Sequence, residues 1–128
     1  MNPEIKDYLD KKAKNLALNK SISTPEAEKR ASEFLEVQAM ITDWRHMLSE
    51  EKIKLLSVQT AVYAEQLSKG TAKTMTENKV TAEASEEYTI AREDLERIEN
   101  DLSYLRSYYE IFNNGHLFYR QLAKGELN

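Results

Sequence analysis

Apolar residues recur every three or four positions along the second half of the chain. The pattern runs through ten positions without a break, and all of them except His116 are apolar or aromatic. This main row consists of Tyr88, Ala91, Leu95, Ile98, Leu102, Leu105, Tyr109, Phe112, His116 and Tyr119. Such spacing places the residues on one face of an α-helix, and an apolar face of this length is typical of a helix that packs against another helix. The pattern predicts a long helix over residues 81–124.

A matching row lies in the first half of the chain and predicts a partner for this helix. It is interrupted at Glu51 and consists of Phe34, Val37, Ile41, Trp44, Leu48, Leu55, Val58 and Val62. Thr24-Pro25-Glu26 is typical of a helix start, because it supplies a capping hydroxyl, a proline at the first helical position and an acid near the positive end of the helix dipole. We therefore expect a helix over 25–68, about 65 Å long at ~1.5 Å per residue. The two helices have nearly equal lengths, which favours an antiparallel pair.

The remaining segments complete an all-α prediction. After Pro3 and Glu4, residues 3–18 can form a short N-terminal arm helix with a thin apolar stripe of Ile5, Leu9 or Tyr8, Ala13 and Leu16. Residues 69–80 are rich in Thr and Lys and lack an apolar period, so they are expected to form a basic connection with room for a helical turn. With three Gly and two Pro, the chain has little turn chemistry for a β fold. The expected fold is one domain over 1–128, in which the arm precedes a long antiparallel helical hairpin.

A second apolar row beside the main row predicts self-association. Its members are Tyr104, Tyr108, Ile111, Phe118 and Leu122, and Gly115 stands where the spacing calls for one more apolar residue. A pair of helices packed along one row each leaves this row without a partner, so we expect it to form the interface of a helical oligomer. Asn113-Asn114-Gly115 could end the helix, but the apolar spacing continues through it and favours one continuous helix.

The composition excludes several classes of protein. No Cys is present, which rules out disulfides, thiolate nucleophiles and Cys-based zinc sites and fits the reducing cytoplasm. No stretch reaches the ~18 apolar residues of a membrane span, and the N-terminus lacks a signal-peptide core. We therefore expect a soluble, cytoplasmic protein that does not use a membrane.

The residues also lack the constellations of catalysis and cofactor binding. The two histidines, His46 and His116, lack the spacing of a metal site, and no Ser or Cys is placed to form a triad with Asp43 and His46. Lys69-Gly70-Thr71 resembles only a fragment of a phosphate-binding loop and lacks both the upstream glycine and the preceding strand. We expect a non-enzyme without metal or cofactor. Trp44 and His116 fall on the apolar rows and are expected to pack there rather than bind a ligand.

Positive charge is concentrated in two regions, although 18 basic and 22 acidic residues give the chain a net charge of −4. Residues 1–20 carry five Lys against three acids, and residues 69–80 carry three Lys against one Glu. The second group makes the connection a candidate for phosphate contacts, with residues Lys69, Lys73 and Lys79 and, earlier in the chain, Lys52 and Lys54. One copy would bind phosphate weakly, whereas an oligomer would repeat the cluster and gain avidity. A solvated basic tip without a ligand is the alternative.

The order of these segments resembles the phage recombination mediators of the UvsY type over almost the whole chain. The segments that carry the resemblance are "PEIKDYLDKKAKN", a polar break, the helix "EAEKRASEFLEVQAMITDWRHMLSEEKIKLLSVQTAVYAEQLSKG" with its central Trp, the connection "TAKTMTENKVTAEASEEY" and the aromatic-rich helix "REDLERIENDLSYLRSYYEIFNNGHLFYRQLAKGE". The resemblance implies a bacteriophage protein of DNA recombination and repair, located in the host cytoplasm. It implies a homo-oligomer, commonly a ring joined through C-terminal helices. Such an oligomer binds single-stranded DNA, weakens the hold of single-strand-binding protein and loads a RecA-like recombinase.

The sequence departs from the family's pattern in the region where the family contacts DNA. These contacts come from basic residues late in the first long helix and near its turn, to which Lys69, Lys73 and Lys79 correspond best. Residues 58–68 contain Glu65 and no Lys or Arg, so the chain would bind more weakly or would use Lys52 and Lys54. The alternative function is a purely structural coiled-coil adaptor, scaffold or chaperone-like oligomer that binds no nucleic acid. A prefoldin-like hairpin is disfavoured because "TAKTMTENKV" does not supply a convincing pair of strands. Binding of single-stranded DNA separates these alternatives.

Overall fold

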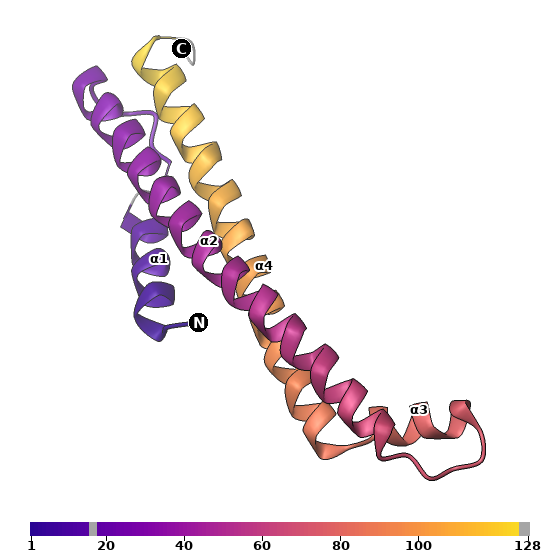
Figure 1. Cartoon of the computed structure of the whole chain (residues 1–128). Coiled ribbons are helices and arrows are strands. Elements are labelled where there is room, and N and C mark those ends of the chain that lie inside the picture. The colour runs from indigo at the N-terminus through magenta and orange to yellow at the C-terminus, as the bar shows by residue number, and fades with distance from the viewer. Residues whose placement is uncertain (16–17, 126–128) are drawn as a thin grey trace. The chain divides into compact units, whose positions relative to one another are not determined.

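The computed structural model describes residues 1–15 and 18–125, and Figure 1 shows how they are built. These residues form four helices and no strand: α1 (Pro3–Asn15), α2 (Thr24–Ser68), α3 (Met75–Glu83) and α4 (Glu86–Ala123). The all-α prediction is confirmed. None of the helices in these ranges combines the length and the apolar character needed to cross a bilayer.

The contacts within the chain divide it into two compact units. We call residues Met1–His46 and Ser103–Asn128 the aromatic unit, and residues Met47–Leu102 the loop unit. Both long helices contribute to both units, whereas α1 belongs to the aromatic unit and α3 to the loop unit.

The aromatic unit is organised around a buried cluster of rings. Phe34 of α2 lies 5.6 Å from Phe112 and 5.7 Å from Tyr119, measured between ring centroids, and both partners belong to α4. Phe112 and Tyr119 are completely buried, and Phe34 is 3 % exposed. The buried side chains of α4 in this unit, Leu105, Phe112 and Tyr119, are all members of the main row. Burial of these rings against one another contributes to the stability of this unit.

Helix α4 continues through Asn113-Asn114-Gly115, as the apolar spacing predicted. Gln38 on α2 donates a hydrogen bond from Nε2 to Oδ1 of Asn113 at 3.1 Å, so the polar residue is used in packing and does not end the helix. Gly115 is buried, and a Cβ at this position would lie 2.4 Å from Cε1 of Phe34. The gap in the second row at Gly115 is therefore filled by the ring of Phe34.

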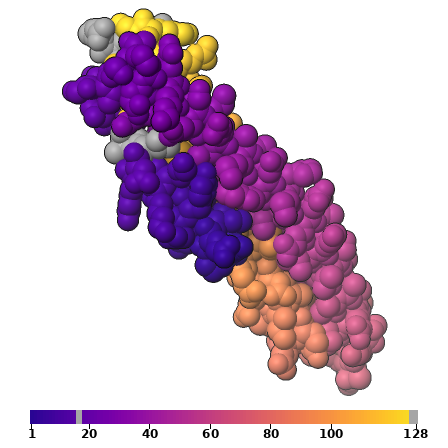
Figure 2. Space-filling view, turned by 90° about the vertical axis from the view of Figure 1, so that its left-hand side faces the viewer, coloured from indigo at the N-terminus to yellow at the C-terminus, as the bar shows by residue number. Residues whose placement is uncertain are grey.

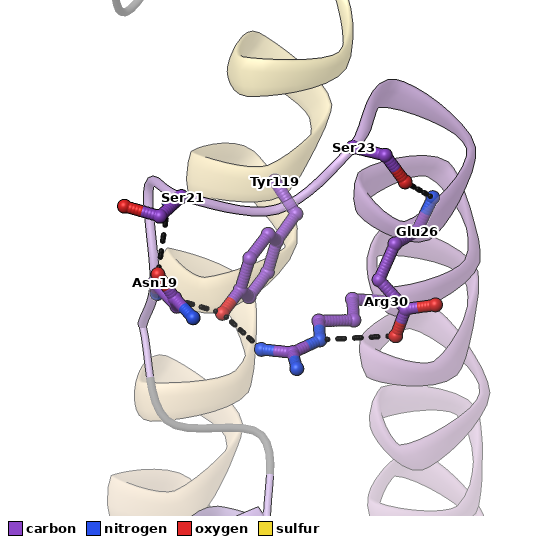
Figure 3. A network of polar contacts seen from close by, with 6 residues as sticks. All are labelled: Asn19, Ser21, Ser23, Glu26, Arg30 and Tyr119. Atoms are coloured by element: carbon purple, nitrogen blue, oxygen red, sulfur yellow. Dashed lines mark hydrogen bonds and ion pairs between the residues drawn. The ribbon is translucent and has the colours of Figure 1, made fainter.

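A polar network ties the segment before α2 to both long helices of the aromatic unit (Figure 3). The hydroxyl of Tyr119 accepts hydrogen bonds from the backbone N–H of Asn19 at 3.0 Å and from Arg30 Nη1 at 2.9 Å. Arg30 also forms an ion pair with Glu26, one helical turn away, at 3.4 Å. The buried ring of Tyr119 is thus combined with a hydroxyl that has partners, which removes the cost of burying a polar atom.

The arm helix, predicted over residues 3–18, does not include Leu18. Helix α1 ends at Asn15, and Leu18 lies outside any helix with 59 % of its surface exposed. Leu16, which was expected on the apolar stripe of this helix, lies outside the described residues.

The loop unit has fewer buried side chains. Among its residues, the buried ones are Ala82, Ala91, Leu95 and Ile98, and the last three belong to the main row. Val58 was expected to pack in the row of α2 but is 50 % exposed, while Gln59 and Tyr63 are half-buried. A 3-4 repeat drifts around a straight helix of 3.6 residues per turn, so the contact face of α2 has shifted to these positions.

The connection between α2 and α4 contains more helix than a single turn. Thr74 caps α3, since its hydroxyl accepts a hydrogen bond from the N–H of Glu77 at 3.2 Å. Ser85 caps α4 in the same way through the N–H of Tyr88, also at 3.2 Å. These two caps explain why helix begins at Met75, inside the predicted connection, and why α4 begins at Glu86 and not at residue 81.

Candidate nucleic-acid interface

All five lysines predicted to contact DNA belong to the loop unit. Lys52 and Lys54 lie on α2, Lys69 directly follows that helix, Lys73 precedes the cap of α3, and Lys79 lies on α3. Their side chains differ in how far they are already neutralised.

Two of the five lysines form ion pairs within the loop unit. Lys69 lies 3.3 Å from Glu65, and Lys52 lies 3.6 Å from Glu99. Lys54, Lys73 and Lys79 are exposed and form no ion pair with any described residue. We refer to these last three residues as the unpaired lysines. They are the best candidates for phosphate contacts, because an ammonium group that is not held in an ion pair keeps more of its attraction for an anion.

The loop that carries Lys73 is ordered by the side chain of Asn78. Oδ1 of Asn78 accepts a hydrogen bond from the N–H of Ala72 at 2.9 Å, and Nδ2 donates to the carbonyl of Ala72 at 3.4 Å. Gly70 lies against the same side chain, and a Cβ there would be 2.5 Å from Oδ1 of Asn78. Lys73 therefore stands between Ala72, held by Asn78, and the capping residue Thr74, which limits the positions that its backbone can adopt.

The acidic face of α4 limits how strongly the loop unit attracts DNA. Between residues 86 and 102, α4 carries seven acids against two arginines. Each arginine is engaged locally, Arg92 with Glu96 at 3.9 Å and Arg97 with Asp94 at 3.4 Å. Attraction for phosphate must therefore come from α2, the loop and α3, and one copy should bind weakly and with strong salt dependence.

An open pocket of ≈ 210 Å³ lies in the loop unit. It is lined by Gln59, Thr60, Tyr63, Glu83 and Tyr88, which come from α2, α3 and α4. The rings of Tyr63 and Tyr88 are 5.6 Å apart and tilted by 57°. Neither hydroxyl has a hydrogen-bond partner among the described residues. The apolar pattern placed Tyr88 on the main row and gave no signal for Tyr63 or Glu83. The pattern describes one helix at a time, whereas these residues belong to different helices and line the same pocket only in the folded chain.

Part of the predicted oligomer row is covered by α1. The hydroxyls of Tyr104 and Tyr108 both donate hydrogen bonds to Oδ1 of Asp10, the former at 3.1 Å. Further along the row, Ile111 is 49 % exposed, and Phe118 and Leu122 are half-buried. The prediction that these five residues join one copy to another stays a prediction, but two of them have a partner in their own chain.

Helix α1 is held by few apolar contacts. Leu9 is its buried residue, while Tyr8 packs edge-on against Trp44 with the ring centroids 6.1 Å apart. Tyr8 also donates a hydrogen bond to Sδ of Met40 at 3.5 Å, and Lys6 lies over the ring of Tyr104. Figure 2 shows α1, in indigo, on the surface of the aromatic unit.

The contact between α1 and α4 shifts the ionisation of its members. Hydrogen bonding from Tyr108 is the main reason that the pKa of Asp10 lies below its usual value. Burial, together with the hydrogen bonds to Asp10, raises the pKa of both Tyr104 and Tyr108. The arm is therefore docked best at pH values where Asp10 is charged and both phenols are protonated.

The two histidines differ in their environment. Nδ1 of His116 donates a hydrogen bond to the carbonyl oxygen of Ala31 at 2.9 Å, and His46 is exposed. Within residues 1–15 and 18–125, no group of three or more His, Cys, Asp or Glu side chains is placed to hold a metal ion.

Comparisons of the chain with protein-family models, with curated proteins and with solved structures found no match.

Proposed function

We propose that this protein is a single-stranded-DNA-binding recombination mediator that helps to load a RecA-like recombinase onto DNA covered by single-strand-binding protein. The observation that carries the proposal is the presence of the unpaired lysines, Lys54, Lys73 and Lys79, in a unit whose loop is ordered by Asn78 and Thr74. The resemblance of the segment order to the UvsY type supports the recombination role.

The proposal includes an assembly. We infer that α2 and α4 form an antiparallel hairpin and that several copies associate in a closed oligomer such as a ring, through the exposed part of the second row around Ile111. An apolar row that is self-complementary between copies is suited to a closed symmetric oligomer. Assembly would bring several loop units to one strand of DNA, and the weak attraction of each would be multiplied.

In this mechanism the lysines contact the phosphates and do not read a sequence. Several lysine clusters spaced around the oligomer would impose a path on the strand, and the changed path would weaken the hold of single-strand-binding protein. The recombinase would then nucleate on DNA that is already separated from that protein. Phosphate contacts of this kind make the affinity fall steeply with salt.

The test is a titration of fluorescently labelled oligonucleotide at several salt concentrations. We expect the assembled protein to bind at low salt and the double variant Lys73→Glu/Lys79→Glu to lose most of this affinity. The slope of log K against log salt is about −0.7 per phosphate contact on single strands, so losing two contacts per copy should make the slope less steep by about 1.4 for each copy that contacts the strand.

The matched control is Lys20→Glu/Lys29→Glu, which makes the same charge change at exposed positions of the aromatic unit. It should bind nearly as well as the unmodified protein, and light scattering should give all three proteins the same subunit number. Absence of binding at low salt, or an equal loss in the control, would contradict the proposal.

A structural adaptor is the second candidate, and exposed apolar side chains of the loop unit favour it. Ile53, Val80 and Ile90 are each more than half exposed, at 65 %, 62 % and 52 %. Such residues suit a surface that docks on another protein. An oligomer that forms normally but binds no oligonucleotide at low salt would support the adaptor over the mediator.

A further inference from the structure

We propose that the pocket between Tyr63, Tyr88 and Glu83 binds one nucleobase of the single strand and prefers bases that carry an exocyclic amino group. This inference rests on the proposed function, since it assigns a second kind of contact to the same DNA. We call these three residues, together with Gln59 and Thr60, the base pocket.

The aromatic part of the base pocket offers a stacking surface. Tyr63 and Tyr88 are both half-buried, so their rings are fixed by their surroundings yet remain open on one side. Their centroids are 5.6 Å apart, which means that the rings touch each other and leave no space for a base between them. A base would therefore stack on the ring surface that faces the pocket, as bases do on the aromatic platforms of proteins that bind single strands.

In the polar part of the base pocket, Glu83 favours a base whose edge carries a hydrogen-bond donor. Glu83 is exposed and forms no ion pair with a described residue, so its carboxylate is free to accept hydrogen bonds. Carboxylates accept from the amino group of cytosine, and adenine and guanine also carry amino groups. Thymine has no amino group, and its one donor, N3–H, lies between two carbonyl oxygens that repel a carboxylate. The negative charge of Glu83 repels phosphate, which favours contact with a base edge at this position.

A phosphate contact lies one helical turn from the pocket. Lys79 and Glu83 are both on α3 and are four residues apart, a spacing that places side chains on the same side of a helix with Cβ atoms about 5–6 Å apart. Lys79 is exposed and unpaired, so it can bind the backbone of a strand whose base enters the pocket. The loop unit thus combines the two features of single-strand binding sites, positive charge along the backbone and aromatic rings for the bases.

The size of the pocket agrees with one base. Its volume of ≈ 210 Å³ is below the roughly 300–1,000 Å³ that is typical of sites for drug-sized ligands. The pocket is open to solvent, so a strand can place a base in it without a conformational change of the three helices.

The experiment compares oligo-dC with oligo-dT of equal length, since both are pyrimidines of similar size and both have one ring. We expect the unmodified protein to bind oligo-dC about 5–10-fold more tightly at low salt. Tyr63→Leu should weaken binding of both oligonucleotides about 10-fold through the loss of stacking. Tyr63→Phe keeps the ring and should bind oligo-dT nearly as well as the unmodified protein, which separates stacking from misfolding.

The decisive readout is the ratio of the two affinities in Glu83→Gln. Removal of a negative charge should raise the affinity for both oligonucleotides, but the preference for oligo-dC should fall toward 1, since a glutamine side chain can also donate to the thymine carbonyl. Glu86→Gln removes the same charge from a nearby exposed position outside the base pocket and should leave the ratio unchanged. Equal binding of the two oligonucleotides, or an unchanged ratio in Glu83→Gln, would overturn the inference while the salt-dependent lysine contacts, and with them the proposed function, could still stand. Failure of every oligonucleotide to bind at low salt would overturn both.

Discussion

The two units of this chain use the same two long helices for different purposes. In the aromatic unit the six largest fully buried side chains of the described residues are found, among them Tyr119, Phe112 and Leu9. In the loop unit the buried side chains are few, and apolar residues such as Ile53 and Val80 are largely exposed. The unpaired lysines and the base pocket also belong to the loop unit. The comparison indicates that one unit holds most of the buried core, whereas the proposed contacts with partners lie on the other.

The largest expected effect is the loss of a buried ring. Phe112→Ala should lower the free energy of unfolding by about 3–5 kcal/mol, because it removes a completely buried side chain and leaves a cavity beside Phe34. Ile53→Ala in the loop unit, where the side chain is 65 % exposed, should change it by less than about 0.5 kcal/mol. Denaturant unfolding followed by circular dichroism measures both. Similar losses in the two variants would contradict the division of roles.

Crowding at Gly115 should give the next largest effect. Gly115→Ala places a Cβ 2.4 Å from the ring of Phe34, and this ring is buried and cannot move away, so we expect destabilisation of about 1–3 kcal/mol. Asn114→Ala is the control at the neighbouring exposed position of α4, where alanine should be neutral or slightly stabilising. Thermal unfolding of the two variants tests this prediction, and a stabilised Gly115→Ala protein would show that the helices can separate at little cost.

The example of Gly115 also shows what the sequence can and cannot predict. The 3-4 spacing identified the buried face of α4 and the continuity of the helix through Asn113-Asn114-Gly115. It could not tell which side chain fills the place beside Gly115, because periodicity gives the face of a helix and not the residue that packs against it. For the same reason, the row that contains Tyr104 was expected to face another copy, although α1 with Asp10 already contacts it. A thin apolar stripe such as that of α1 carries little information about where the helix docks.

The site was harder to predict than the fold. The lysines could be chosen from local charge, but their pairing depends on tertiary contacts such as that between Lys52 and Glu99. Tyr63 and Glu83 line one pocket in a region where α3 and α4 are separate helices, capped by Thr74 and Ser85. A prediction of 69–80 as a mostly irregular segment therefore hides this pocket.

Removal of a single hydroxyl should give a smaller effect that again differs between the units. Tyr119→Phe takes away the acceptor for Asn19 and Arg30 and should cost about 1–2 kcal/mol in the free energy of unfolding. Tyr88→Phe removes a hydroxyl that has no hydrogen-bond partner among the described residues and should cost almost nothing. The pair can be measured by denaturant unfolding at neutral pH, and an equal cost in both variants would argue against a stabilising role for the network in Figure 3.

The smallest expected effect concerns docking of α1. The pKa of Asp10 is lowered in the folded protein, so its contribution is present above its ordinary value of about 4 and is lost as the pH falls through the lowered value. The pKa values of Tyr104 and Tyr108 are raised, so their contribution is present below about 10 and is lost at higher pH. The protection factors of the amides of residues 3–15, which are corrected for the intrinsic pH dependence of amide exchange, should therefore be highest between these limits. Asp10→Asn should speed up this exchange at neutral pH and remove most of the acid dependence, and an unchanged pH profile in this variant would exclude Asp10 as the cause.

The proposed division between a unit that supports the fold and a unit that binds DNA is tested most directly by hydrogen–deuterium exchange of the assembled protein with and without single-stranded oligonucleotide at low salt. The account predicts new protection in residues 69–83 and around Tyr63 and Tyr88, with the amides near Phe34 and Phe112 unchanged. Protection confined to the aromatic unit, or no protection anywhere while the oligonucleotide is bound, would contradict it.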